Sequence, residues 1–354
     1  MAERITIQDI ADALGLSRNT VSKAINNTGL LAESTREKVL QKAMDMGYKQ
    51  FSYVTIAGLN DRKTETLSTA NEIAMFSASL VDNSHFASTM LDKLQRELSL
   101  LGYSFTMHRI REEEVAALKI PPSYNIERTA GIICVEMFDK AYSTMLCSMG
   151  KPILFVDSPV AGLDEPLRAD CLYMENKANI YRMVKEMSER GKKRIGFIGK
   201  YLHCQSFFER YMGYRNAMYL LRLPLSEKYC ITGCKEGTRL SSTADYREYL
   251  EDSFRKLSSM PDVFICANDF VALDALAALK KLGLSVPEDI WLCGFDDSPE
   301  SKVVTPSLTT VHIHSQIMGF SATHLLLSRI KEPSLNFRTL HTETSLIYRE
   351  STGD

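Results

Sequence analysis

Residues 5–26 read ITIQDIADALGLSRNTVSKAIN, and this stretch decides the fold of the N-terminal part of the chain. Apolar side chains recur at helical spacing over residues 7–14, and Thr6 stands before them as a residue that can cap a helix. Gly15 ends this helix, because glycine readily takes the left-handed conformation that a helix end needs. Ser17 can cap the next helix. The stretch therefore predicts two short helices joined by a tight turn, which is the spacing of a helix-turn-helix.

The second of these helices carries donor-rich side chains on its outer face: Arg18, Asn19, Thr20, Ser22 and Lys23. Such side chains suit hydrogen bonds to base edges and phosphates, so this face predicts a DNA-binding helix. The alternative is an ordinary three-helix cap whose polar face meets only water. In either case a third helix is expected over residues 34–46.

The pattern changes further along the chain. Over residues 50–71 the periodicity fades into polar sequence, which is typical of a linker. Short apolar runs then alternate with amphipathic helices. The expected strands cover residues 73–81, 103–108, 131–135, 152–157, 194–198, 263–266 and 290–295. Strands that are apolar on both faces indicate parallel sheets covered by helices on both sides. We therefore expect an all-α helix-turn-helix headpiece at residues 1–49, a linker at 50–71, and a two-lobed α/β domain at 72–354.

Composition excludes several classes of protein. The chain has 354 residues, of which 45% are hydrophobic and 24% charged, as in ordinary globular proteins and unlike disordered or fibrous chains. The net charge of −2 excludes a polycation. The N-terminus has no apolar leader, and no stretch is long and apolar enough to span a membrane. We expect a cytoplasmic protein whose eight Cys are reduced thiols.

Motifs for other chemistries are missing from the sequence. It contains no phosphate-binding loop, no dinucleotide-binding glycine pattern and no nucleophile elbow. His312 and His314 alternate along an expected strand and so face one side, but no third ligand stands near them for a metal. We therefore expect no cofactor, no metal site and no enzymatic activity.

Motifs along nearly the whole chain then resemble those of LacI/GalR-family repressors. They stand in the family's order at residues 5–11, 16–26, 35–39, 46–48, 194–199, 210–214, 267–269, 286–290, 294–297 and 305–311. Two features depart from the family. Its hinge helix has only Ile56-Ala57-Gly58-Leu59 as a counterpart within residues 50–62, which leaves open whether such a helix forms. Ala32 stands where the third helix usually has a serine cap.

The resemblance implies a two-lobed domain like the periplasmic sugar-binding proteins, with an effector in the cleft. Matching motifs place Arg210, Asn268 and Asp296 in that cleft. Independently of the family, Asn268 and Asp296 each follow an apolar strand, and ligands of parallel sheets bind at such strand ends. Asn268 could also serve as a helix cap. Strand ends and helix starts elsewhere add weaker candidates: His85, Phe86, Asp157, Ser158 and Ser206, the last of which is expected to cap a helix that starts at residue 207.

These expectations combine into one functional hypothesis. The chain is a repressor that binds a pseudo-palindromic DNA operator as a homodimer, and a small effector, a sugar or sugar derivative, controls that binding. A tetramer is not expected, because no leucine-heptad helix follows residues 344–348. The expected DNA contacts are Thr6, Ser17, Arg18, Asn19, Thr20, Ser22, Lys23 and Asn26. Two alternatives remain: an α/β enzyme acting on a sugar or nucleoside with a DNA-binding tether, and a DNA-binding protein that has lost its effector.

Overall fold

The computed structural model describes residues 5–25, 31–46, 70–78, 85–161, 165–233 and 243–354. The chain forms two compact units, Met1–Ser68 and Thr69–Asp354. Asn26 and the hinge question at residues 50–62 lie outside the described residues. Within the described residues, no helix is both long and apolar enough to cross a membrane.

The first unit is a helix-turn-helix followed by a third helix. Its helices are α1 (Ile7–Leu14), α2 (Arg18–Ile25) and α3 (Glu33–Asp45). Thr6 caps α1 reciprocally with Asp9, and Gly15 ends it with a left-handed backbone at φ 65°. The Ser17 hydroxyl accepts the N–H of Thr20 at 3.1 Å. These caps confirm the expected helix starts and the expected turn. Side chains of α1, α2 and α3 pack together in a small apolar core.

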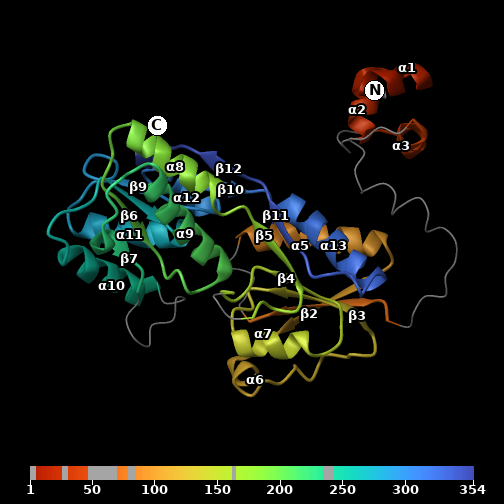
Figure 1. Cartoon of the computed structure of the whole chain (residues 1–354), viewed down its shortest axis with the longest axis horizontal. Coiled ribbons are helices and arrows are strands. Elements are labelled where there is room, and N and C mark those ends of the chain that lie inside the picture. Colours follow the sequence, from red (N-terminus) through yellow and green to blue (C-terminus); the bar gives the residue numbers. More distant parts are fainter. Residues whose placement is uncertain (1–4, 26–30, 47–69, 79–84, 162–164, 234–242) are drawn as a thin grey trace. The chain divides into compact units, whose positions relative to one another are not determined.

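The second unit contains a six-stranded parallel sheet, which we call the first lobe (Figure 1). Its order is β11-β5-β4-β3-β1-β2. The strands are β1 (Glu72–Ser77), β2 (Ser104–Arg109), β3 (Thr129–Val135), β4 (Ile153–Val156), β5 (Asp170–Met174) and β11 (Thr339–Thr342). The helices of this lobe are α5 (His85–Leu100), α6 (Glu112–Ala116), α7 (Lys140–Cys147) and α13 (Ser315–Lys331). Helices α5 and α13 pack closely against each other.

A four-stranded parallel sheet, β7-β6-β8-β9, forms the second lobe. Its strands are β6 (Ile195–Ile198), β7 (Cys230–Ile231), β8 (Val263–Cys266) and β9 (Trp291–Cys293). The accompanying helices are α8 (Ala178–Glu189), α9 (Gln205–Leu220), α10 (Thr243–Arg255), α11 (Asp269–Lys281) and α12 (Pro299–Val303). An antiparallel pair, β10 (Thr310–Ile313) and β12 (Thr344–Ile347), lies beside β9. The expectation of two α/β lobes with parallel sheets is confirmed.

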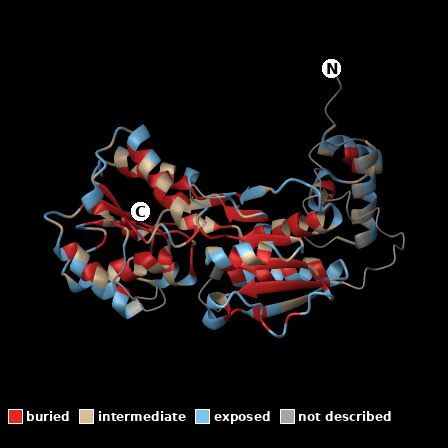
Figure 2. Cartoon of the chain, turned by 60° about the horizontal axis from the view of Figure 1, so that its bottom comes forward, coloured by how far each residue is buried: buried red, intermediate tan, exposed pale blue. Residues whose placement is uncertain are grey.

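Burial explains why the strands could be recognised in the sequence. Every residue of β1, β4, β6 and β8 is buried, and Figure 2 shows both sheets as buried layers under helices with one exposed side. One hydrophobic cluster contains side chains from both lobes, among them Ile133, Phe197 and Phe295. The two sheets are therefore joined by shared packing as well as by the chain itself.

Several expected boundaries were wrong by a few residues. The strand expected at 290–295 is only Trp291–Cys293, and the helix expected from 207 begins at Gln205. Strand β1 ends at Ser77, four residues before the expected end, although residues 79–81 lie outside the described range. The chain passes between the lobes after β5, after β10 and after β11. These passages bring residues distant in sequence to the strand ends where the lobes meet.

Candidate functional site

Helix α2 exposes one polar face in the first unit. Val21 and Ala24 are buried, so Arg18, Asn19 and Lys23 face outward, and all three are exposed. Within the described residues, no hydrogen bond or ion pair engages these three side chains. Their donors are therefore available to an external partner.

The other side chains expected to contact DNA have partners inside the unit. The Thr6 hydroxyl donates to the Asp9 carboxylate at 2.7 Å, and the Ser17 and Thr20 hydroxyls lie 2.8 Å apart. Ser22 is half-buried and also has a partner within the chain. Caps of this kind fix the start of each helix, so these hydroxyls orient the outward-facing donors of α2.

Arg210 of α9 occupies the junction between the lobes. Its side chain is almost fully buried, and its Nε donates to Asn176 Oδ1 at 2.9 Å. Its Nη1 donates to the Ala267 carbonyl at 2.7 Å and lies 3.5 Å from Asp296 Oδ1. The guanidinium carbon lies 3.6 Å from the centre of the Phe295 ring. Through Nε and Nη1, Arg210 thus ties the segment after β5 to two strand ends of the second lobe.

Asp296 follows β9 and lies at this junction with a strained backbone. Its φ is 119°, in the region that favours glycine, and its side chain is only 17% exposed. Burial raises the pKa of Asp296 to about 7, against the opposing effect of the Arg210 charge. The nearby Asp269 carboxylate raises it further. Asp296 therefore changes its charge near neutral pH, as groups at ligand sites often do.

Asp157 and Ser206 join the two lobes directly. Asp157 follows β4 of the first lobe, and its Oδ1 accepts the N–H of Ser158 at 2.8 Å and of Ser206 at 3.1 Å. Burial raises the pKa of this carboxyl group, which the same hydrogen bonds oppose. Ser206 does not cap α9, contrary to expectation, because the helix begins one residue earlier at Gln205. Instead its hydroxyl donates to Met174 Sδ at 3.2 Å.

Glu209 makes another link between the lobes that the sequence did not reveal. It lies on α9 of the second lobe, 3.5 Å from His341 Nε2 on β11 of the first. Asn176 Nδ2 donates to it at 3.0 Å. Burial raises the pKa of Glu209, but hydrogen bonds from His341, Asn176 and Gln205 outweigh this and lower it to about 2. This carboxylate therefore stays charged, and its contact with His341 links the two lobes.

Asn268 caps a helix, which was the alternative role expected for it from the sequence. It is the cap of α11, and its Oδ1 accepts the N–H of Val271 at 3.0 Å. At the other lobe, His85 begins α5, but the side chains of His85 and Phe86 are outside what the structure describes. Thr89, one turn further along α5, lines the cavity described next.

A cavity of about 470 Å³ lies beside Asp296 and is bordered by both lobes. It is lined by Thr89, Asp296, Asp297, Pro299, Lys302, His312, Ile313, His314, Ser315, Gln316 and Ile317. Of the expected effector residues, only Asp296 is in this lining. The structure brings Asp157, Ser206 and Arg210 to the same junction, where they hold the lobes together.

The two histidines face the same side, as their alternation predicted. Their ring centres lie 4.9 Å apart in an edge-to-face arrangement. His314 Nε2 is 2.9 Å from the Ser345 hydroxyl, and His312 Nδ1 is 2.9 Å from Asp297 Oδ2. Among the residues that the structure describes, no group of three or more His, Cys, Asp or Glu side chains could hold a metal ion.

Asp297 is surrounded by cationic groups. Lys302 Nζ lies 3.1 Å from its Oδ2, on the same oxygen as His312, and Arg349 pairs with its Oδ1. Burial raises the pKa of Asp297, but the contacts with Arg349, Lys302 and His312 outweigh this and lower it below the ordinary value. Asp297 is therefore a carboxylate at neutral pH. The sequence placed it next to Asp296 but gave no sign of these distant partners.

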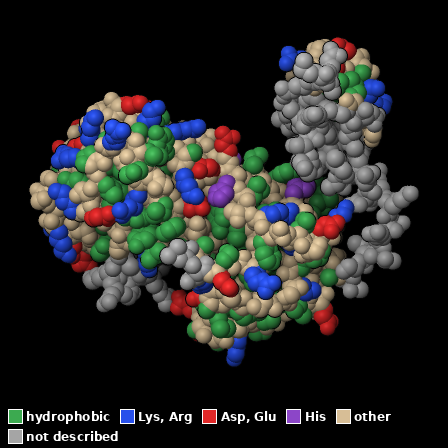
Figure 3. Space-filling view, in the orientation of Figure 1, with side chains coloured by type: hydrophobic (Ala, Val, Ile, Leu, Met, Phe, Trp, Pro, Cys, Tyr) green, Lys and Arg blue, Asp and Glu red, His purple; other side chains and the backbone are tan. Residues whose placement is uncertain are grey.

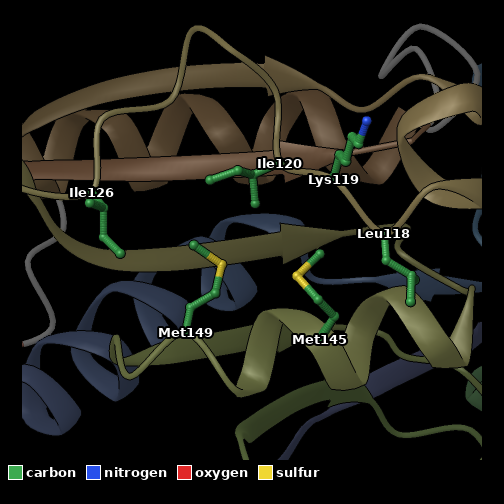
Figure 4. A pocket seen from close by; sticks show the side chains of 6 residues that line it. All are labelled: Leu118, Lys119, Ile120, Ile126, Met145 and Met149. Atoms are coloured by element: carbon green, nitrogen blue, oxygen red, sulfur yellow. The ribbon is translucent and has the colours of Figure 1, made fainter.

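A second cavity, of about 510 Å³, lies on the first lobe away from this junction. It is lined by Leu118, Lys119, Ile120, Ile126, Met145 and Met149. Figure 4 shows the apolar side chains pointing inward, while the Lys119 ammonium points away. This cavity has no converging polar groups, which a site specific for a small polar ligand requires.

Charge elsewhere on the second unit is mixed. On the face seen in Figure 3, Lys and Arg side chains alternate with Asp and Glu, without one broad patch of either sign. The cationic groups around Asp297 therefore act locally at the cavity.

Two family models match parts of this chain. A model described as bacterial regulatory proteins of the lacI family matches residues 6–50, and one described as a periplasmic binding protein-like domain matches residues 184–352. The HTH-type transcriptional repressor PurR of Vibrio cholerae is 25% identical over 353 residues, which cover 99% of this chain and 98% of the repressor. The HTH-type transcriptional regulator GalR of Lacticaseibacillus casei is 27% identical, over 98% of this chain and 99% of the regulator.

Solved structures share the fold. A complex of the transcriptional regulator CelR with cellobiose has a TM-score of 0.65 and 24% identity, covering 98% of this chain and all of that one. A Lac repressor dimer bound to its operator and the anti-inducer ONPF has a TM-score of 0.65 and 20% identity, covering 99% of both chains. These relatives are transcription regulators rather than enzymes.

Proposed function

Because the chain belongs to the LacI family of bacterial transcription regulators, we propose that it is a repressor whose affinity for a DNA operator is set by a small molecule bound beside Asp296. In this proposal residues 1–49 bind DNA, and residues 72–354 bind the effector and dimerise. Residues 50–71 link these two domains. The protein acts in the cytoplasm and catalyses no reaction.

The DNA contact is assigned to the exposed face of α2. The second helix of a helix-turn-helix lies in the major groove, and its N-terminal residues meet base edges. Arg18 and Asn19 stand in the first turn of α2, with donors that no described residue engages, so they read bases, and Lys23 contacts a base or a phosphate. The remaining residues proposed to contact DNA are Thr6, Ser17, Thr20, Ser22 and Asn26.

The effector site is assigned to the cavity of about 470 Å³, and this cavity is the observation that carries the proposal. Thr89 of the first lobe and Asp296 of the second both border it, so a ligand there touches both lobes. A ligand shifts an equilibrium only by binding one conformation better than another, and a bridging ligand favours one relative position of the lobes. The other residues proposed for the effector site are His85, Phe86, Asp157, Ser158, Ser206, Arg210 and Asn268.

We propose a sugar or sugar derivative as the effector. Carboxylates such as Asp296 accept hydrogen bonds from sugar hydroxyls, and amide and imidazole groups in the lining can do the same. The similarity to a regulator solved with cellobiose supports this class of ligand.

Two measurements on the full-length protein test the proposal. Selection from a random DNA library should return a two-fold symmetric site. Fluorescence anisotropy with that site, repeated with a panel of sugars and sugar derivatives, should find a compound that changes the operator affinity tenfold or more. Selection of no preferred sequence would refute DNA reading, and an operator affinity that no compound alters would refute effector control.

A further inference from the structure

The side chain of Asn176 connects Glu209 to Arg210. Asn176 lies between β5 and α8, where the chain passes from the first lobe to the second, and it is fully buried. Its Oδ1 accepts from Arg210 Nε at 2.9 Å, and its Nδ2 donates to Glu209 Oε2 at 3.0 Å. A guanidinium group can only donate hydrogen bonds, so Arg210 requires the amide oxygen on its side. The amide nitrogen then faces Glu209, where it needs an acceptor.

Glu209 supplies that acceptor, because a carboxylate offers two oxygens and no donor. Gln205 Nε2 donates to the other carboxylate oxygen, Oε1, at 3.2 Å, and Lys177 Nζ lies 3.6 Å from Oε1. Oε2 is therefore left to Asn176 and His341. Removing this oxygen would deprive a fully buried amide donor of the partner that the structure gives it, which is costly.

Arg210 depends on this hold at Nε for the direction of its other donors. Its Nη1 donates to the Ala267 carbonyl at 2.7 Å and lies 3.5 Å from Asp296 Oδ1. A guanidinium group is planar and rigid, so fixing Nε also fixes the direction of Nη1. If the Asn176 amide turned over, it would present a donor to a donor, and Nε would lose its acceptor. The Asn176 amide therefore helps to direct Arg210 at Ala267 and Asp296.

His341 extends this network to the first lobe. It lies on β11, and its Nε2 is 3.5 Å from Glu209 Oε2. Its ring centre lies 5.3 Å from that of Tyr173 on β5, the strand that pairs with β11. Glu209 belongs to α9 of the second lobe, so the same carboxylate oxygen contacts both the first lobe and the Asn176 amide.

We propose that Glu209 is a positioning residue: by holding the Asn176 amide in one orientation, it keeps Arg210 directed at Ala267 and Asp296. The contact with His341 makes this orientation depend on the relative position of the lobes, because hydrogen-bond networks carry coupling between distant groups. The inference rests on the proposed effector site, to which Arg210 and Asp296 belong. Glu209 acts on that site through Asn176.

Side-chain NMR of the full-length protein tests this by following the Arg210 Nε–H group, whose signal is identified by its loss in R210K. Hydrogen exchange of this group reports how often its hydrogen bond opens. E209L removes the acceptor and should speed the exchange by about tenfold or more, the factor that corresponds to losing one buried hydrogen bond. E209A removes the same acceptor with a shorter side chain and should give the same increase, which keeps the test available if E209L does not fold.

Three comparisons separate positioning from a general loss of stability. E209Q keeps an oxygen for Asn176 and should restore an exchange rate within about threefold of the wild type. The control E189L replaces an exposed glutamate of α8 and should leave Arg210 unchanged. Backbone amides of α9 should also stay within about threefold in E209L, whereas a merely structural role would speed their exchange together with that of Arg210.

A double-mutant cycle tests the route through Asn176. N176A removes the bridge, so E209L should add less than about threefold to the exchange rate once Asn176 is absent. Additive effects of N176A and E209L would overturn the proposal, and so would an unchanged Arg210 exchange rate in both E209L and E209A.

Operator affinity of the wild type, measured with the panel of sugars, distinguishes this inference from effector control. If E209L releases Arg210 but no sugar changes the wild-type affinity, the positioning role stands and effector control fails. If a sugar changes that affinity but E209L leaves Arg210 protected, effector control stands and the positioning role is refuted.

Discussion

Asp296 combines a proposed role in ligand binding with a pKa near neutral pH. Its side chain borders the cavity, lies 3.5 Å from Arg210 and is mostly buried. Burial raises its pKa to about 7 from an ordinary value of 3.8. An acid whose pKa is raised by folding binds more protons in the folded state, so stability falls as pH rises between the two values.

D296N removes this titration. We expect the wild type to lose about 1–3 kcal/mol of unfolding free energy relative to D296N between pH 5 and pH 8. Urea denaturation at both pH values measures the difference. Arg210 keeps its contacts with Asn176, Ala267 and Phe295 in the variant, so D296N should fold. Parallel pH profiles of the two proteins would contradict a raised pKa.

Arg18 is the residue that we propose recognises a base. It is exposed in the first turn of α2, where the recognition helix meets base edges. R18A should cost about 1–3 kcal/mol of operator affinity and change the preferred base at one position of each half-site. Library selection with both proteins measures this. The control K38A removes an exposed lysine of α3. If R18A instead weakened DNA binding equally for all sequences, Arg18 would contact a phosphate and not a base.

For helices and strands, the sequence predicted the features that depend on neighbouring residues. Apolar runs identified β1, β2, β3, β4, β6, β8 and β9, whereas β5, β7 and β11 of the same sheets were not expected. Thr6, Gly15 and Ser17 identified the turn of the first unit. Partners far along the chain could not be predicted in this way. Asp297 depends on Arg349, 52 residues away, and Asp170 of β5 depends on Arg329 and Arg338. Likewise, a matching motif located Arg210 but could not show that its Nε and Nη1 already bond to Asn176 and Ala267.

Helix α13 was not expected from the sequence, because it packs against α5 and against strands β3, β4 and β5 of the first sheet rather than lying half in water. Gly319 allows its close approach to α5: a Cβ there would lie 2.4 Å from the Met90 carbonyl oxygen. Gly-to-Ala changes within helices usually stabilise by about 1 kcal/mol. G319A should instead destabilise the protein by about 1–3 kcal/mol, because the two helices must separate.

Urea denaturation of the full-length protein measures the effect of G319A. S321A, on the same helix and only partly buried, is the matched control and should change stability by less than about 0.5 kcal/mol. A stabilised G319A would show that α5 and α13 are not in the close contact described.

At the scale of the whole molecule, a helix-turn-helix gains affinity when two copies bind one two-fold symmetric operator. We therefore expect the full-length protein to be a dimer at micromolar concentration, held by the second unit. Light scattering with in-line size-exclusion chromatography gives the mass directly. A mass near 40 kDa, that of one 39.9 kDa chain, or near four times that value would contradict the expectation.

We propose that a ligand bridging the two lobes beside Asp296 changes operator affinity. Asp157 and Ser206 join the lobes by one hydrogen bond, and Glu209 and His341 join them by another contact. A ligand in the cavity adds to this coupling or competes with it, and either effect changes the population of lobe arrangements.

The most direct test is the operator affinity of wild type and D296N, measured by fluorescence anisotropy at pH 8 with and without the compound found in the panel of sugars and sugar derivatives. The wild-type affinity should change tenfold or more on adding ligand. D296N should bind the operator within about threefold of wild type without ligand, because Asp296 lies in the unit that does not contain α2, and should lose most of the response. A full response in D296N, or no response in the wild type, would contradict the account.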